Sequence, residues 1–138
     1  MIARLAVPAS GMMLLAMFSL VGCRGDVDAG DPGLVMDVAF SPTPPAVGPA
    51  RLIITLRDTS GAPVEGALVV VEGNMSHAGM TPVLDTAEAE GPGAYGVPDF
   101  TFTMAGDWFL TVEATLPDGS QARTVRSTNV VGRIGGSS

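Results

Sequence analysis

Short runs in which apolar and polar residues alternate recur along this chain, and they limit its fold more than any other feature. Apolar residues share one parity in the segments 34–40, 51–57 and 108–116. Alternation with a period of two is typical of β-strands that bury one face. No stretch shows sustained helical periodicity, so the sequence predicts an all-β fold.

Turn signals separate these runs. Residues 41–50 contain four prolines, which cannot donate to a strand ladder and therefore predict a connection or an edge. The segment 58–66 predicts a hairpin connection, and 117–120 predicts a type I turn. Roughly seven short strands separated in this way predict a single immunoglobulin-like antiparallel β-sandwich over residues 34–132.

Some strands can be described further from their side chains. Residues 69–71 are valines, apolar on both parities, so we expect a central strand that is covered on both faces. Two weaker strands are expected, one before Glu90 and one after Ala94. Tyr95 and Trp108 are large aromatic residues that we expect to anchor the core.

The N-terminus has one positive charge at Arg4 and then a largely apolar run at 5–20. This layout is typical of a secretory signal peptide, and the run is short for a membrane-spanning helix, which needs about 20 apolar residues. The run ends in LVGC, which resembles a bacterial lipobox, so the sequence predicts a lipoprotein signal peptide at 1–22 and a lipid on Cys23. Two alternatives stay open: a free or intermolecularly paired Cys23 thiol, and an apolar segment retained as an anchor.

The mature chain that follows from this prediction is acidic. All fourteen Asp and Glu and six of the seven Arg follow Cys23, which gives a formal charge of −8. Such a chain repels phosphate backbones, so we do not expect nucleic acid as a partner. Residues 23–33 are rich in Asp and Gly and predict a flexible tether, and 133–138 predict a flexible tail.

The stretch NMSHAGM at 74–80 places the only histidine, His77, between Met75 and Met80. Cu(I) is a soft ion that prefers thioether and imidazole donors, so these three residues are candidate copper ligands, with Met104 as a fourth. An imidazole binds metal in its neutral form, which predominates above a pH of about 6.5. The alternative is structural: Met75 and Met104 continue buried parities, burial is the favoured expectation for Met104, and His77 then only caps a turn.

Other chemistries have less support in the sequence. A Ser-His-Asp site would need a nucleophile motif to accompany His77, and none is present. A zinc site would need more histidine or cysteine ligands. Asp85, Glu88 and Glu90 lack the spacing of a calcium loop, so a solvated strand face is the favoured interpretation for them. We therefore expect no enzymatic activity and infer no small-molecule substrate.

Four motifs occur in a fixed order: DTSGAPVEGA at 58–67, MSHAGM at 75–80, GAY at 93–95 and FTFTMAGDWFLTV at 100–112. Their order resembles the YtkA-like and FixH-like domains, which are small exported or membrane-anchored bacterial sandwiches. The resemblance implies an immunoglobulin-like fold and an association with copper handling or cytochrome oxidase assembly. In that family the loop often carries adjacent histidines or more methionines, whereas this chain has His77 alone.

Two functional classes therefore stay open. The first is a periplasmic or other extracytoplasmic accessory domain, tethered to the membrane through its lipid anchor, that binds Cu(I) through the Met/His loop. The second is a non-enzymatic module of the cell envelope that contacts another envelope protein and binds no metal. Both place the protein in the cell envelope, facing the periplasm or the exterior.

The lipobox generates the first testable prediction. We expect the mature protein to begin at a lipid-bearing Cys23 and to partition with membranes, because several acyl chains hold a protein at a membrane surface. Replacement of Cys23→Ser should leave an unprocessed precursor. Intact-mass analysis measures both outcomes, and a soluble mature chain that begins at another residue would contradict the prediction.

Overall fold

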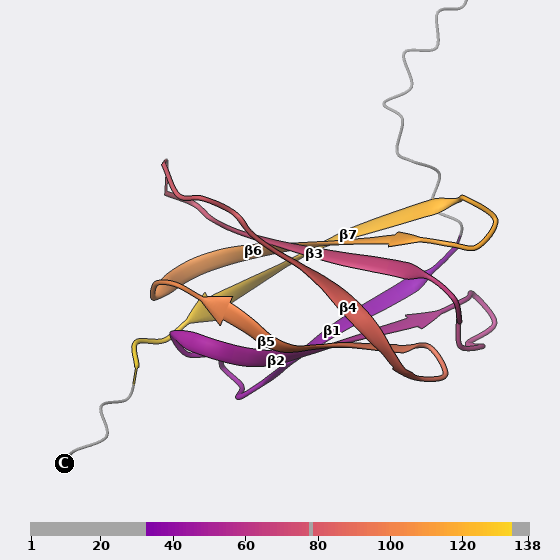
Figure 1. The fold of residues 1–138 in the computed structure, drawn as a ribbon, viewed down its shortest axis with the longest axis horizontal. Helices are drawn as coiled ribbons and strands as arrows, with labels where there is room; N and C mark the ends of the chain where they lie inside the picture. Colours follow the sequence, from indigo (N-terminus) through magenta and orange to yellow (C-terminus); the bar gives the residue numbers. More distant parts are fainter. Residues whose placement is uncertain (1–32, 78, 134–138) are drawn as a thin grey trace, which may run out of the picture.

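In the computed structural model, which describes residues 33–77 and 79–133, the chain forms seven β-strands (Figure 1). The predicted signal peptide at 1–22, Cys23 and most of the tether lie outside the described residues, as do the last five residues of the tail. Within the described part, no helix is long and apolar enough to cross a membrane. The strands are β1 (Val35–Ser41), β2 (Gly48–Arg57), β3 (Leu68–Met75), β4 (Val83–Gly91), β5 (Ala94–Phe102), β6 (Gly106–Thr115) and β7 (Gln121–Val130).

The strands pair in the order β1-β2-β5-β4-β3-β6-β7, and every pair is antiparallel. Strand β4 pairs with β3 through its first half and with β5 through its second half. It therefore crosses from the layer of β3, β6 and β7 to the layer of β1, β2 and β5, as Figure 1 shows. The predicted all-β, two-layered antiparallel fold is confirmed, with both layers joined into one sheet through β4.

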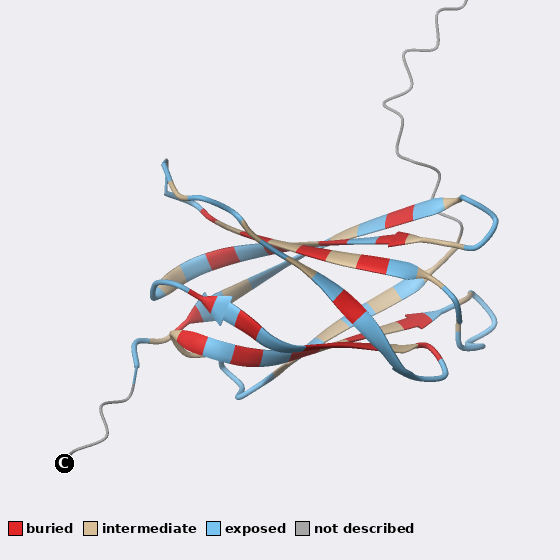
Figure 2. Cartoon of the chain, in the orientation of Figure 1, coloured by how far each residue is buried: buried red, intermediate tan, exposed pale blue. Residues whose placement is uncertain are grey.

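The core lies between the layers and follows the alternation seen in the sequence. Figure 2 shows buried and exposed bands in turn along β2 and β6. Fully buried side chains come from both layers: Leu52, Ile54, Leu56, Val97 and Phe100 from one, and Val69, Val71, Leu110, Val112 and Ala114 from the other. The two strands predicted around Glu90 and Ala94 are β4 and β5, so this part of the prediction is also confirmed.

Two finer predictions are wrong. Strand β3 is central in the sheet, but Val70 is only half-buried and its outer-face neighbour Leu84 is 64% exposed, so β3 is covered on one face. Segment 58–66 is not a hairpin, because β2 and β3 are not neighbours in the sheet. It carries the chain from one layer to the other, and local turn chemistry alone cannot distinguish these two connections.

Tyr95 holds this crossing segment in place. Its hydroxyl donates to the carbonyl oxygen of Val64 at 2.9 Å and accepts from the backbone N–H of Ala67 at 3.1 Å. The ring itself is 2% exposed. The predicted structural role of Tyr95 is therefore confirmed, and its polar tip satisfies a backbone donor and acceptor as buried tyrosines usually do.

Turns at the same end of the sandwich as this crossing segment are held by carboxylates. The Asp58 pKa is lowered first by a hydrogen bond from the Ser60 hydroxyl and then by the backbone N–H of Ala62. The Asp118 pKa is lowered first by the hydroxyl and then by the backbone N–H of Ser120. These turns are therefore favoured above the unfolded pKa of aspartate and weaken as the pH falls through the lowered values.

An aromatic cluster occupies the other end of the core. The Phe102 ring lies 5.2 Å from both Phe100 and Trp108 and 6.4 Å from Phe40, measured between ring centroids. The Trp108 side chain is 1% exposed, and its indole N–H donates to the carbonyl oxygen of Met104 at 2.9 Å. The predicted core position of Trp108 is therefore confirmed.

Removal of the indole should be costly. We expect Trp108→Ala to lower the free energy of unfolding by about 3–5 kcal/mol, because it leaves a large cavity between the layers. Trp108→Phe, which keeps a ring but loses the hydrogen bond to Met104, should cost less. Chemical denaturation of the domain measures both values, and a loss below about 1 kcal/mol for Trp108→Ala would contradict this account of the core.

Candidate functional site

The candidate ligands lie at one end of the sandwich, where three loops come together. Gly48 pairs with Phe102, and Gly106 pairs with Val130, so the β1–β2 loop, the β5–β6 turn and the end of β7 lie at the same end. The β3–β4 loop is at this end as well, because β3 and β6 are antiparallel and β6 begins there. In Figure 1 this is the end on the left, and the β3–β4 loop projects from it.

Met75 is the last residue of β3 and the most clearly placed of the predicted ligands. Its side chain is 8% exposed, and its register partner on β6 is Trp108. A Cβ atom added to Gly106 would lie 3.1 Å from the Met75 methyl carbon Cε. The Met75 thioether therefore reaches across to the β5–β6 turn, and Gly106, with φ at +128°, leaves room for it.

The β3–β4 loop carries the next two candidates in different environments. Met80 is partly buried and packs against the hydrophobic core, whereas the His77 side chain is exposed. The loop therefore keeps one thioether against the body of the domain and presents its imidazole to solvent.

The expected burial of Met104 is wrong. Its side chain is 53% exposed, although its parity matches that of Phe100 and Phe102. Strand β5 ends at Phe102, and the chain turns before β6 begins at Gly106, so the alternation does not extend to Met104. The Met104 carbonyl instead receives the indole N–H of Trp108. This leaves the thioether on the surface of the turn that Met75 approaches.

The four predicted ligands thus lie at one end of the domain. Among them, the side chain of Met75 reaches from β3 to the β5–β6 turn. Three thioethers and one imidazole form a set of neutral, mostly soft donors. Ligands for harder ions are not assembled elsewhere: no group of three or more His, Cys, Asp or Glu that could hold a metal occurs among the described residues.

The acidic segment of β4 has other roles. Glu90 forms an ion pair with Arg51 of β2, and its carboxylate lies over Gly96, where a Cβ atom would collide with it. The Asp85 carboxylate accepts the backbone N–H of Thr86 at 2.8 Å. These contacts fit the interpretation of this segment as a solvated strand face with local hydrogen bonds.

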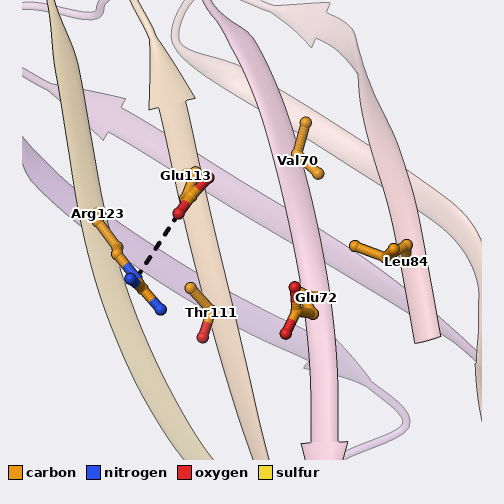
Figure 3. A pocket seen from close by; sticks show the side chains of 6 residues that line it. All are labelled: Val70, Glu72, Leu84, Thr111, Glu113 and Arg123. Carbon is orange, nitrogen blue, oxygen red and sulfur yellow. Dashed lines mark ion pairs between the residues drawn. The ribbon is translucent and has the colours of Figure 1, made fainter. Parts of the chain in front are cut away.

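A shallow depression that is not predicted from the sequence lies on the outer face of β3, β4, β6 and β7. Figure 3 shows the side chains that line its volume of about 90 Å³: Val70, Glu72, Leu84, Thr111, Glu113 and Arg123. The Arg123 guanidinium and the Glu113 carboxylate lie 3.7 Å apart across β6 and β7. The exposed side chains of Leu84, Phe109 and Val125 share this outer face. The only signal for it in the sequence is that the apolar residues of 68–71 occupy both parities.

Comparison with solved structures finds four similar chains, among them the following three. A CopC from Methylosinus trichosporium OB3b has a TM-score of 0.49 at 14% identity, with 72% of this chain and 98% of that chain covered. Murine CRIg has a TM-score of 0.42 at 15% identity, with the same coverage of 72% and 98%. A fibronectin type-III domain of human fibronectin type III domain containing protein 3 has a TM-score of 0.41 at 18% identity, covering 85% and 99%. Similarities at this level carry no inference about function.

No curated protein matches the sequence. Comparison with protein families matches residues 32–113 to the family described as YtkA-like. The match includes β1 to β5, most of β6 and the Met/His loop. It also agrees with the resemblance carried by the motifs at 58–67, 75–80 and 100–112. Because the match covers more than half of the 138 residues, this protein belongs to the YtkA-like family.

Proposed function

We propose that this protein is an extracytoplasmic accessory domain, tethered to the membrane through Cys23, that binds Cu(I) at the end of the sandwich formed by the β3–β4 loop and the β5–β6 turn. The observation that carries the proposal is the position of Met75, whose methyl group lies against Gly106, two residues from Met104. Two thioethers from different elements are thereby brought toward one region of the surface.

The donor set suits Cu(I) better than other ions. Thioethers are soft and uncharged, and they remain available outside the cytoplasm, where thiols are oxidised. Met75 and Met80 would supply donors from the apolar side of the site, since both pack against the core. Met104 and His77 would supply donors from the solvent side, since both are exposed. A bound Cu(I) would give the domain the means to carry or transfer copper.

A second candidate function is a metal-free interaction module of the cell envelope. The observation that favours it is the outer face of β3, β4, β6 and β7, where Leu84, Phe109 and Val125 are exposed. Large apolar side chains gathered on one exposed face are typical of contact surfaces. Copper binding distinguishes the two candidates, because only the first requires it.

Competition titration against a Cu(I) chelator tests the first proposal. We expect the domain to bind one Cu(I) and to prefer it to Zn(II), because most of the donors are thioethers. The variants Met75→Leu, Met80→Leu and Met104→Leu should each weaken binding. Met36→Leu is the matched control. Met36 is also partly buried, but it lies near the start of β1 and pairs with Leu56, at the other end of the sandwich.

Histidine should contribute in a pH-dependent way. Copper affinity of the parent should fall as the pH is lowered, because a proton competes with the metal for the imidazole. His77→Ala should remove this dependence while leaving the stability of the metal-free domain nearly unchanged, because the side chain is exposed. If the parent binds no more tightly than a variant that lacks all four side chains, the copper proposal fails and the interaction module becomes the better account.

A further inference from the structure

Strand β1 ends one side of the sheet, and among residues 33–77 and 79–133 no strand pairs with its outer edge. The sheet order places β1 and β7 at its two ends. All seven residues of β1 pair with β2 in one unbroken register, from Val35 opposite Arg57 to Ser41 opposite Arg51. A straight edge strand presents unpaired N–H and C=O groups, which makes it a template for the addition of another strand.

The side chains of β1 do not protect this edge. Met36, Val38 and Phe40 face inward, pack against the core and are only partly buried. Strand β2 covers one flank of this row, and no described strand pairs along its other flank. The outer face of β1 carries one charge, on Asp37, and the strand contains no proline.

Strand β7 differs from β1 at the other edge. Arg126 has the inward parity of Ala122 and Val130 but is exposed, and an inward-pointing charge at an edge disfavours strand addition. Beyond the end of β7, Val131 donates its N–H to the Pro45 carbonyl at 2.9 Å and accepts from the Val47 N–H at 3.0 Å. Of the two end strands of the described sheet, β1 is therefore the one whose edge is open to a partner.

Symmetry restricts how two copies of β1 can pair. In an antiparallel pair, directly opposite residues point to the same face of the sheet. When two copies of one strand pair, the midpoint of the pair must therefore lie between a residue and its own copy. A pair centred on Asp37 would place two carboxylates directly opposite each other, which is unfavourable. A pair centred on Ala39 would leave Val35 and Met36 without strand partners. A pair centred on Val38 engages all seven residues and opposes no like charges.

We propose that β1 pairs with β1 of a second copy of this chain, antiparallel and centred on Val38. On the inner face, Met36 then lies opposite the partner's Phe40, so the half-buried apolar row continues across the interface. On the outer face, Asp37 lies opposite the partner's Ala39. A second copy is the occupant that fits because the strand is complementary to itself in this register.

In this register the two copies of Asp37 are diagonal neighbours at about 7–8 Å, and nearby arginines bear on their repulsion. Arg57 lies opposite Val35 in the register, close to Asp37, and Arg51 is already paired with Glu90.

Substitutions of Ala39 test the pairing, because this exposed residue faces Asp37 of the partner subunit only in the proposed register. Ala39→Lys should create two opposite-charge pairs by symmetry and raise the dimer association constant about fivefold, whereas Ala39→Asp should lower it about fivefold. The matched controls are Ser127→Lys and Ser127→Asp, which change the same charges at an exposed position of β7. Association constants come from sedimentation equilibrium of the full chain in density-matched detergent micelles at about 0.15 M salt.

The expected order of association is Ala39→Lys above the parent and the parent above Ala39→Asp, with both Ser127 variants near the parent. Equal constants for the two Ala39 variants would overturn the proposal. The same conclusion would follow if the Ser127 variants shifted as much as the Ala39 variants, since the effect would then reflect net charge alone. A chain that remains monomeric in every variant, Ala39→Lys included, would also overturn it.

Discussion

The contact between Phe102 and its aromatic neighbours connects the parts of this protein that matter for its proposed functions. Phe102 lies on β5, and its ring meets Phe40 of β1 and Trp108 of β6, so the cluster spans both layers of the sandwich. The indole N–H of Trp108 then fixes the carbonyl of Met104 in the β5–β6 turn. Aromatic pairs of this kind add to the burial of their own large apolar surface. The turn that presents Met104 and receives Met75 is therefore held in place by the core itself.

Strand β4 gives the sandwich its asymmetry. By pairing with β3 in its first half and with β5 in its second, it joins the two layers along one side. On the opposite side, β1 and β7 are not paired within the described sheet, and Val131, just beyond β7, bonds to the β1–β2 loop. A closed barrel would have no free edges, whereas the strands that the structure describes leave two. The inward-facing Arg126 distinguishes one edge from the other.

The strands could be predicted from the sequence because alternation within a strand is a direct consequence of backbone geometry. The same reasoning gives the wrong burial for Met104, because the parity of Phe100 and Phe102 does not continue past the end of β5. It also failed for segment 58–66, because the same turn residues serve a hairpin and a crossing between layers. Which layer a strand joins depends on contacts between residues far apart in the chain, such as those of Tyr95 with Val64 and Ala67, and local patterns do not encode them.

The candidate site was less accessible to sequence reasoning for a related reason. The types of donor are visible in the stretch 74–80, but their directions depend on how the β3–β4 loop leaves the sheet and on the space beside Gly106. A glycine at that position reads as an ordinary turn residue in the sequence. Only the fold shows that the absence of its side chain admits the Met75 methyl group.

Phe40 links the candidate copper site to the edge of β1. Its ring contacts Phe102 in the cluster that supports the β5–β6 turn, yet the residue is only partly buried because it belongs to the edge strand. A strand added to β1 would cover Phe40 and restrict its motion, and that restriction would reach the turn through Phe102 and Trp108. Because packed interiors transmit strain, association and the geometry of the methionine ligands are expected to be coupled. The outer face of β1 lies on the other side of the strand from this cluster, so charge at Ala39 can alter association without touching the ligands.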